Sequence, residues 1–280
     1  MMQGWRFADI KFVVGALCVG TVAALAVFGD FLATHSPTEQ SLIDSLMPPF
    51  DFAGGHPLGT DQLGRDILAR MVSGARVSLT IAATVVAISG VFGVLVGAVS
   101  GYLGGTRDIV VQKIVETFWA FPAILLAIAV VALFGQTLPN LIIALTLQRW
   151  IPYARLSRAQ ALSLRSREFV AASKIMGGSV PWILRHHILP NLVASSIVIA
   201  TFSMATAIIA EASLSFLGLG VPPGTPTWGG MLAEGRSYIT RAWWLAVLPG
   251  LGIFITVLGL NLLGDWLRDQ FDPKDDLNLV

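Results

Sequence analysis

The sequence predicts an all-α integral membrane protein in which six transmembrane helices form one bundle. Hydrophobic residues make up 55% of the 280 residues and charged residues only 12%. The mean hydropathy of +0.74 is too high for a soluble domain of this length. Six apolar runs also approach the roughly 20 residues that a spanning helix needs. They cover about 12–32, 77–99, 109–134, 138–153, 192–210 and 243–263.

The first apolar run follows Arg6 and Lys11, as the core of a secretory signal would. It is longer than the 7–15 residues of such a core, and no A-x-A cleavage site follows it. We therefore expect an uncleaved membrane anchor. The chain is divided into an N-terminal part, 1–75, with this helix and an external loop, and a core part, 76–280, with the other five helices and a cytoplasmic loop at about 155–190.

The distribution of charge predicts the orientation, because loops on the cytoplasmic side are rich in lysine and arginine. The loop after the fourth run has one acid, Glu168, against six basic residues: Arg155, Arg158, Arg165, Arg167, Lys174 and Arg185. With six spans, both termini share its side. The loop 33–75 then lies outside, where acids outnumber Arg65 and Arg70.

The second run contains Gly93, Gly97 and Gly101, four residues apart on one helix face. Because glycine has no side chain, another helix can approach this face closely. We therefore expect the face to pack within the subunit or against a partner. Four prolines interrupt or begin apolar runs and predict kinks; they are Pro122, Pro139, Pro152 and Pro249.

We single out two ionisable residues in or beside the apolar runs, Arg149 and Glu211, because a charge near the bilayer centre costs about 2.5–3.5 kcal/mol. Arg149 is either a side chain that reaches back to the inner surface or part of an aqueous pathway. Glu211 lies near the outer end of the fifth run. It is either an interfacial carboxylate that accepts hydrogen bonds from Ser213 or Ser215, or a second pathway residue.

The cytoplasmic loop has an internal pattern. Residues 169–176 lack helix breakers, Gly177 and Gly178 supply a bend, and Pro181 falls in the first turn of a second short helix with Ser179 as its cap. This predicts a helix, a corner and another helix. Small residues in the first helix suit a partner protein's groove, whereas the basic residues would equally favour anionic lipid.

The same residues resemble the EAA loop of ATP-binding-cassette importer permeases, E-A-A-x3-G-x9-I-x-L-P. Ala171-Ala172-Ser173, Gly177 and the run from His187 to Pro190 keep its spacing. Alanine replaces the leading Glu, serine the second Ala, and histidine the Ile.

Three further segments are similar to the C-type permease subunit of the dipeptide, oligopeptide and nickel transport group. They are HPLGTDQLGRDILARMVSGARVSL from His56, EASLSFLGLGVPPGTPTWGGML from Glu211 and NLLGDWLRDQFDPK from Asn261. The chain is therefore identified as a member of this family, which implies the type I importer permease fold with its coupling loop between helices 4 and 5.

The resemblance implies a homologous second permease subunit, two cytoplasmic ATPases and an external substrate-binding protein. No G-x-x-x-x-G-K-[ST] occurs in the chain, so we expect no enzyme activity and no bound cofactor, with ATP used by the partner subunits. The residues assigned to ATPase docking are Ala171, Ala172, Ser173, Gly177 and Gly178, with Pro190 fixing the start of helix five.

On the outer side, a turn rich in glycine and aspartate is either a contact for the binding protein or purely structural. Its residues are Gly59, Asp61, Gly64, Arg65 and Asp66. We expect the three charged ones to form a local network.

Peptides are the expected cargo, because His35, His56, His186 and His187 all fall in loops and leave no nickel-binding cluster in the spans. Nickel and glutathione-like cargo stay open. With Cys18 as the single cysteine, we expect neither a disulfide nor a metal site. No basic cluster with interleaved aromatic residues suggests nucleic acid. The alternatives are an ion-coupled transporter, which would need Arg149 and Glu211 as its intramembrane charges, and a structural scaffold.

Overall fold

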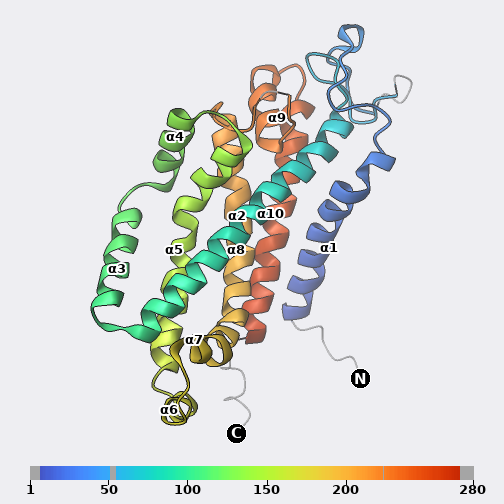
Figure 1. Cartoon of the computed structure of the whole chain (residues 1–280). Helices are drawn as coiled ribbons and strands as arrows, with labels where there is room; N and C mark the ends of the chain where they lie inside the picture. Colours follow the sequence, from blue (N-terminus) through green and yellow to red (C-terminus); the bar gives the residue numbers. More distant parts are fainter. Residues whose placement is uncertain (1–6, 51–54, 223, 272–280) are drawn as a thin grey trace, which may run out of the picture.

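The computed structural model describes residues 7–50, 55–222 and 224–271, whose regular structure is helical apart from one isolated bridge. Long helices run along a bundle and short ones lie at its two ends (Figure 1). The helices are α1 (Phe7–Phe28), α2 (Ile67–Leu103), α3 (Gly105–Trp119), α4 (Ala123–Phe134), α5 (Leu138–Leu164), α6 (Glu168–Ile175), α7 (Val180–Ile183), α8 (Leu189–Phe216), α9 (Trp228–Gly235) and α10 (Trp244–Phe271). A π-helical turn, Leu184–Ile188, joins α7 to α8.

The middle of the bundle consists of α2, α5, α8 and α10, with α1 along α10 and with α3 and α4 beside α5 (Figure 1). One end carries α9 and the segment that precedes α2. The opposite end carries α6 and α7, and there α1 begins and α10 ends. An ion pair of 2.8 Å between Lys11 Nζ and Asp269 Oδ2 joins these two helices. Helix α1 therefore begins, and α10 ends, on the same side of the bundle as α6. A topology with six spans predicts that the two ends of the chain share one side.

Four helical stretches are long and apolar enough to cross a membrane: Asp9–Phe31, Ile67–Leu103, Val180–Phe216 and Trp244–Phe271. The pair α3 and α4 passes the same test but is bent by 81°. The more polar α5 has 27 residues, roughly 40 Å of helix, which exceeds the ~30 Å hydrocarbon core. Each of the six predicted runs thus corresponds to a helical part of an all-α membrane bundle.

The third predicted run, 109–134, is broken rather than one helix. The backbone of Pro122 is extended, with φ −61° and ψ 126°. Proline has no N–H to donate and disfavours the helical conformation in the residue before it. As a result α3 ends at Trp119, and α4 starts in a new direction.

Other helices extend beyond the predicted apolar runs. The start of α2 is Ile67 rather than 77, because the Asp66 side chain caps it by accepting a hydrogen bond of 2.7 Å from the Ala69 amide. The predicted division after residue 75 falls inside this helix. Likewise, α5 continues past 153 to Leu164. An apolar run in the sequence shows which part of a helix lies in the membrane. It does not show how far the polar turns at either end continue the helix.

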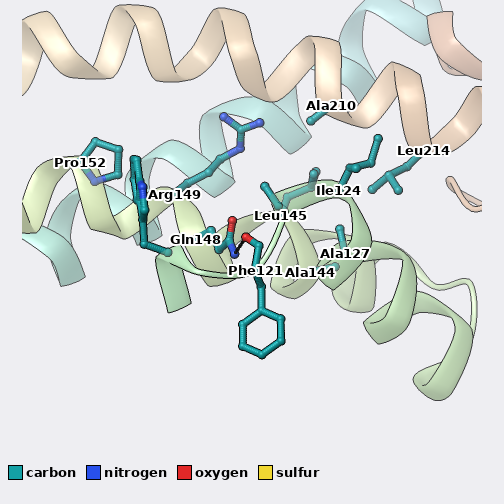
Figure 2. A pocket seen from close by; sticks show the side chains of 12 residues that line it. Phe121, Ile124, Ala127, Ala144, Leu145, Gln148, Arg149, Pro152, Ala210 and Leu214 are labelled. Carbon is teal, nitrogen blue, oxygen red and sulfur yellow. Dashed lines mark hydrogen bonds between the residues drawn. The ribbon is translucent and has the colours of Figure 1, made fainter. Parts of the chain in front are cut away.

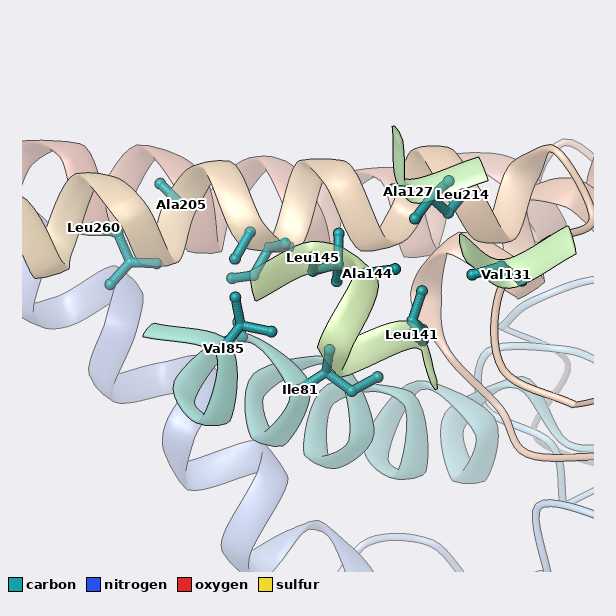
Figure 3. Close-up of a cluster of buried hydrophobic side chains, with 13 residues drawn as sticks. Ile81, Val85, Ala127, Val131, Leu141, Ala144, Leu145, Ala205, Leu214 and Leu260 are labelled. Carbon is teal, nitrogen blue, oxygen red and sulfur yellow. The ribbon is translucent and has the colours of Figure 1, made fainter. Parts of the chain in front are cut away.

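The largest cluster of buried apolar side chains lies where α2, α4, α5 and α8 meet (Figure 3). Ile81 and Val85 of α2 face Leu141 and Leu145 of α5 there, and Leu214 joins them from α8. Alanines are frequent among the other members, which allows the helix backbones to approach closely. Four of its members, Ala127, Ala144, Leu145 and Leu214, also line the cavity described below.

The predicted glycine face of α2 packs against α5 within the subunit. A Cβ atom added at Gly93, Gly97 or Gly101 would collide with backbone oxygen atoms of Trp150, Ala154 or Arg158, respectively. The prediction of a close helix interface is confirmed. At the end of this interface the Arg158 guanidinium also donates to both carboxylate oxygens of Asp108, at 2.7 and 2.6 Å, and so fixes the corner between α2 and α3.

Replacing Gly97 with leucine is expected to separate α2 from α5 and to destabilise the bundle by about 1–3 kcal/mol or more, as overpacking does. The measurement is the thermal unfolding midpoint in detergent. Gly20→Leu is the matched control, because Gly20 is exposed and a Cβ there has no neighbour within 4 Å. Equal midpoints for the two variants would contradict the close α2–α5 interface.

Candidate functional site

The segment between α5 and α8 folds as predicted into helix, corner and helix. The corner follows α6, where Gly177 has a φ of +84°, in the left-handed region that glycine adopts at little cost. The Gly177 amide donates to Lys174 O at 3.0 Å and the Gly178 amide to Ser173 O at 2.9 Å. Pro181 lies in the first turn of α7 as predicted, but Ser179 makes no capping side-chain hydrogen bond.

One face of this segment is anchored to the bundle. Val170 and Ile183 are buried and pack in a cluster with Ala98, Tyr102 and Ala161 of α2 and α5. The ammonium of Lys174 lies 5.0 Å from the ring centroid of Tyr102, close enough for a cation–π contact. Movement of α6 and α7 would therefore be transmitted to the ends of α2 and α5.

The opposite face is exposed and unusually apolar for a segment outside the spans. Ile175 and Met176 are 87% and 80% exposed. The rings of Phe169, at the start of α6, and Trp182, in α7, are half-exposed. Sequence reasoning missed these residues, although two large apolar side chains directly before Gly177-Gly178 were a usable signal. They form, with Ala171 and Ala172, the surface that we call the exposed coupling face, defined by Phe169, Ala171, Ala172, Ile175, Met176 and Trp182.

One predicted docking residue, Ser173, lies differently from expectation. Ser173 is only 3% exposed and is buried in α6 together with Val170, so it belongs to the anchoring face. Pro190 lies in the first turn of α8, as the sequence predicts, although the helical stretch runs unbroken from Val180 to Phe216. Since proline lacks the N–H of a regular helical turn, the π-helical turn before it takes up the irregularity, with the Leu189 amide donating to Leu184 O.

At the other end of the bundle, the predicted charge network exists with partners that the sequence did not indicate. Asp61 accepts hydrogen bonds from Arg65 Nε at 2.5 Å and from the guanidinium of Arg70. Both arginines also bind Glu234 of α9, at 2.7 and 2.8 Å. Asp61 and Arg70 are 1% and 3% exposed, so this is a buried cluster that ties the segment before α2 to α9.

Asp66 stays outside this cluster. One carboxylate oxygen caps α2, and the other lies 2.8 Å from His56 Nδ1. Gly59 and Gly64 have positive φ angles, 78° and 70°, and a Cβ on either would strike a neighbouring backbone. Gly59, Asp61, Gly64 and Asp66 are buried and Arg65 is partly buried, which favours a structural role for the outer turn. Direct contact with a binding protein stays a prediction.

A cavity of about 430 Å³ opens between α4, α5 and α8 (Figure 2). Its described lining is apolar except for Gln148 and Arg149 on α5, which project toward it beside Pro152. The Arg149 guanidinium donates to Thr206 Oγ1 at 2.7 Å and to Thr206 O at 2.8 Å. Arg149 therefore lines this cavity, and its part in a translocation pathway stays a prediction.

Glu211 is absent from the described cavity lining and is not interfacial. Ala210 and Leu214 of α8 border the cavity, but Glu211 is fully buried on another face of the same helix. Ser78 of α2 and Ser215 donate to its two carboxylate oxygens at 3.1 and 2.7 Å, whereas Ser213 bonds its own helix at Ile209 O. Glu211 therefore joins α8 to α2, and its assignment to the pathway is corrected.

A spanning helical bundle with an anchored helix–corner–helix segment at one end has the architecture of a type I ATP-binding-cassette importer permease. It superposes on a chain of the inward-facing MetNI methionine ABC transporter with a TM-score of 0.56 at 20% identity, covering 72% of this chain and 97% of that chain. This likeness establishes the fold.

The chain belongs to the family of binding-protein-dependent transport system inner membrane components, whose model matches residues 93–275. It is 42% identical to the di/tripeptide transport system permease protein DppC of Pseudomonas aeruginosa, over 98% of this chain and 92% of the relative. It is 36% identical to the oligopeptide transport system permease protein OppC of Bacillus subtilis, over 96% and 90%. The chain is thus a non-catalytic permease subunit of a transporter that works with ATPase and substrate-binding proteins.

Proposed function

We propose that this chain and a homologous second permease form the translocation pathway of an importer for dipeptides or oligopeptides. Two ATPase subunits would use ATP on the cytoplasmic side, and this chain would bind no cofactor itself. The single observation that carries the coupling role is the exposed coupling face, whose helices are anchored to α2 and α5 by the buried cluster around Val170. The names of the relatives support the peptide cargo.

The α6 end of the bundle is proposed to face the cytoplasm, which also places both termini there. Basic residues concentrate at this end, and the rule that lysine and arginine mark cytoplasmic loops supports the orientation. The exposed coupling face would then insert into a groove between ATPase elements. A helix held there must follow the ATPases when they close on ATP, so two arrangements of the pore could be coupled to two states of the ATPases.

The first test is copurification in mild detergent from native membranes, followed by measurement of ATP hydrolysis with and without the binding protein. We expect a second permease and two ATPase subunits, with hydrolysis raised by the substrate-loaded binding protein. Isolation of the chain alone in a transport-competent form would overturn the proposal. A binding protein loaded with Ni²⁺ or glutathione would correct the cargo and leave the assembly intact.

Replacing Arg149 with glutamine is expected to lower peptide uptake about tenfold or more. A guanidinium facing an apolar cavity can attract the carboxylate of a passing peptide, and hydrogen bonds to charged groups contribute about 1.5–3 kcal/mol. The measurement is uptake by proteoliposomes at saturating ATP and binding protein.

Arg155→Gln is the matched control, since Arg155 lies on the same helix but stacks over Trp119, 4.5 Å from the ring centroid. We expect its uptake to stay near that of the wild type. If Arg149→Gln transports at the control rate, Arg149 has no part in the pathway.

A further inference from the structure

Two histidines from separate segments of the outer loop lie face to face. The ring centroids of His35, which follows α1, and His56, which precedes α2, are 4.4 Å apart with planes inclined by 35°. His56 is 7% exposed, and His35 is half-buried. The sequence predicted no metal site, because all four histidines fall in loops and Cys18 is the single cysteine. Only the fold brings His35 and His56 together.

The hydrogen bonds of both rings leave the same nitrogen available. His56 Nδ1 is 2.8 Å from the buried Asp66 carboxylate, which can only accept, so this nitrogen carries the proton. His35 Nδ1 is bonded to the Thr34 hydroxyl at 3.0 Å. Within the described residues neither Nε2 atom has a hydrogen-bond partner. A neutral imidazole held by a carboxylate on one nitrogen presents a lone pair on the other, as metal-binding histidines do.

The three groups lie close to the spacing that one small ion requires. His35, His56 and Asp66 offer ligand atoms that lie within 4.8 Å of one another. Two nitrogen ligands of one zinc ion, at 2.0–2.1 Å each, are at most about 4.2 Å apart. The remaining adjustment can be made by the half-buried His35 side chain, because His56 is fixed by Asp66 and Asp66 by its cap on α2.

We propose that His35 and His56 bind a divalent transition-metal ion, Zn²⁺, through their Nε2 atoms, with Asp66 positioning His56. Imidazole ligands favour zinc, copper and nickel over magnesium and calcium. The ion would tie the segment after α1 to the start of α2 across the external loop. The site is distinct from the cavity near Arg149 and from the exposed coupling face, so this inference is independent of the cargo.

The test measures how much zinc the assembled transporter binds in detergent. Bound metal is first removed with a chelator, and Zn²⁺ is then titrated back. We expect the wild type to hold one zinc ion more per permease than His35→Ala. Zinc affinity at this site should fall by at least about tenfold in the variant, because losing even an outer-shell partner of a metal ligand has an effect of that size. Zinc should raise the thermal midpoint of the wild type and leave that of the variant unchanged. In zinc-free buffer the two proteins should unfold at the same temperature, which shows that His35→Ala is folded.

The control is His186→Ala/His187→Ala, because this pair lies in the π-helical turn before α8, where the two rings contact Trp182 with centroids 4.6 and 5.1 Å away. It should retain the extra zinc ion. Full zinc stoichiometry in His35→Ala, or loss of the ion in the control instead, would overturn the proposal. A His35→Gln variant provides a second measurement if the alanine variant unfolds early.

Discussion

A Gly177→Val permease is expected to assemble in the membrane and to lose ATP-driven transport about tenfold or more. The reason is conformational, because Gly177 has a φ of +84° and a Cβ there would meet no atom within 4 Å. A β-branched residue in the left-handed region costs about 1–2 kcal/mol or more. Valine would therefore favour a different corner and change the angle between α6 and α7.

The change should act on the exposed coupling face more than on stability. Ile175 and Met176 precede the corner and Trp182 follows it, so a new angle separates side chains that together form the face. Val170 and Ile183 remain in the buried cluster that holds the segment to the bundle. We therefore expect the ATPases to bind weakly or to hydrolyse ATP without transport.

The measurement compares peptide uptake with ATP hydrolysis in proteoliposomes. Gly135→Val is the matched control, since Gly135 also has a positive φ, +91°, and open space around it, but lies between α4 and α5 at the opposite end. In the Gly135→Val transporter, ATP hydrolysis should remain coupled to peptide uptake. If Gly177→Val transports normally, or if both variants fail alike, the corner at Gly177 does not couple ATP hydrolysis to transport.

The coupling segment could be predicted because its pattern is local. A breaker-free run, two glycines and a proline act over a few residues, and such signals determine helix ends directly. The glycine face of α2 was equally readable, since four-residue spacing places three glycines on one side whatever the partner. What the sequence left open there was the partner, which is α5.

The features that escaped prediction depend on residues far apart in the chain. Glu211 could not be assigned to a helix face, because its partner Ser78 comes from another helix. The network around Asp61 includes Glu234, and the histidine pair joins segments on either side of the external loop. The bend at Pro122 was visible as a proline, but a proline within a span also occurs in helices that continue, as Pro152 does inside α5.

Replacing Asp61 with asparagine is expected to destabilise the permease by about 3–5 kcal/mol, the cost of breaking a buried ion pair from one side. Its carboxylate accepts from the side chains of Arg65 and Arg70 and from the amides of Leu63 and Arg65, at 2.8 and 3.0 Å. An amide of the same shape loses the charge and turns a donor toward the guanidinium groups. Arg70 would then be buried beside Glu234 alone.

The thermal midpoint in detergent and the amount of permease in the membrane should both fall for Asp61→Asn. Glu234→Gln serves as the control, because the Glu234 side chain is 38% exposed and ion pairs with exposed partners contribute at most about 1 kcal/mol. Uptake per surviving Asp61→Asn molecule should stay close to normal if the outer turn is structural. A stable, abundant variant that has lost stimulation by the binding protein would instead place Asp61 at that partner's contact, since only a functional role could then separate activity from stability.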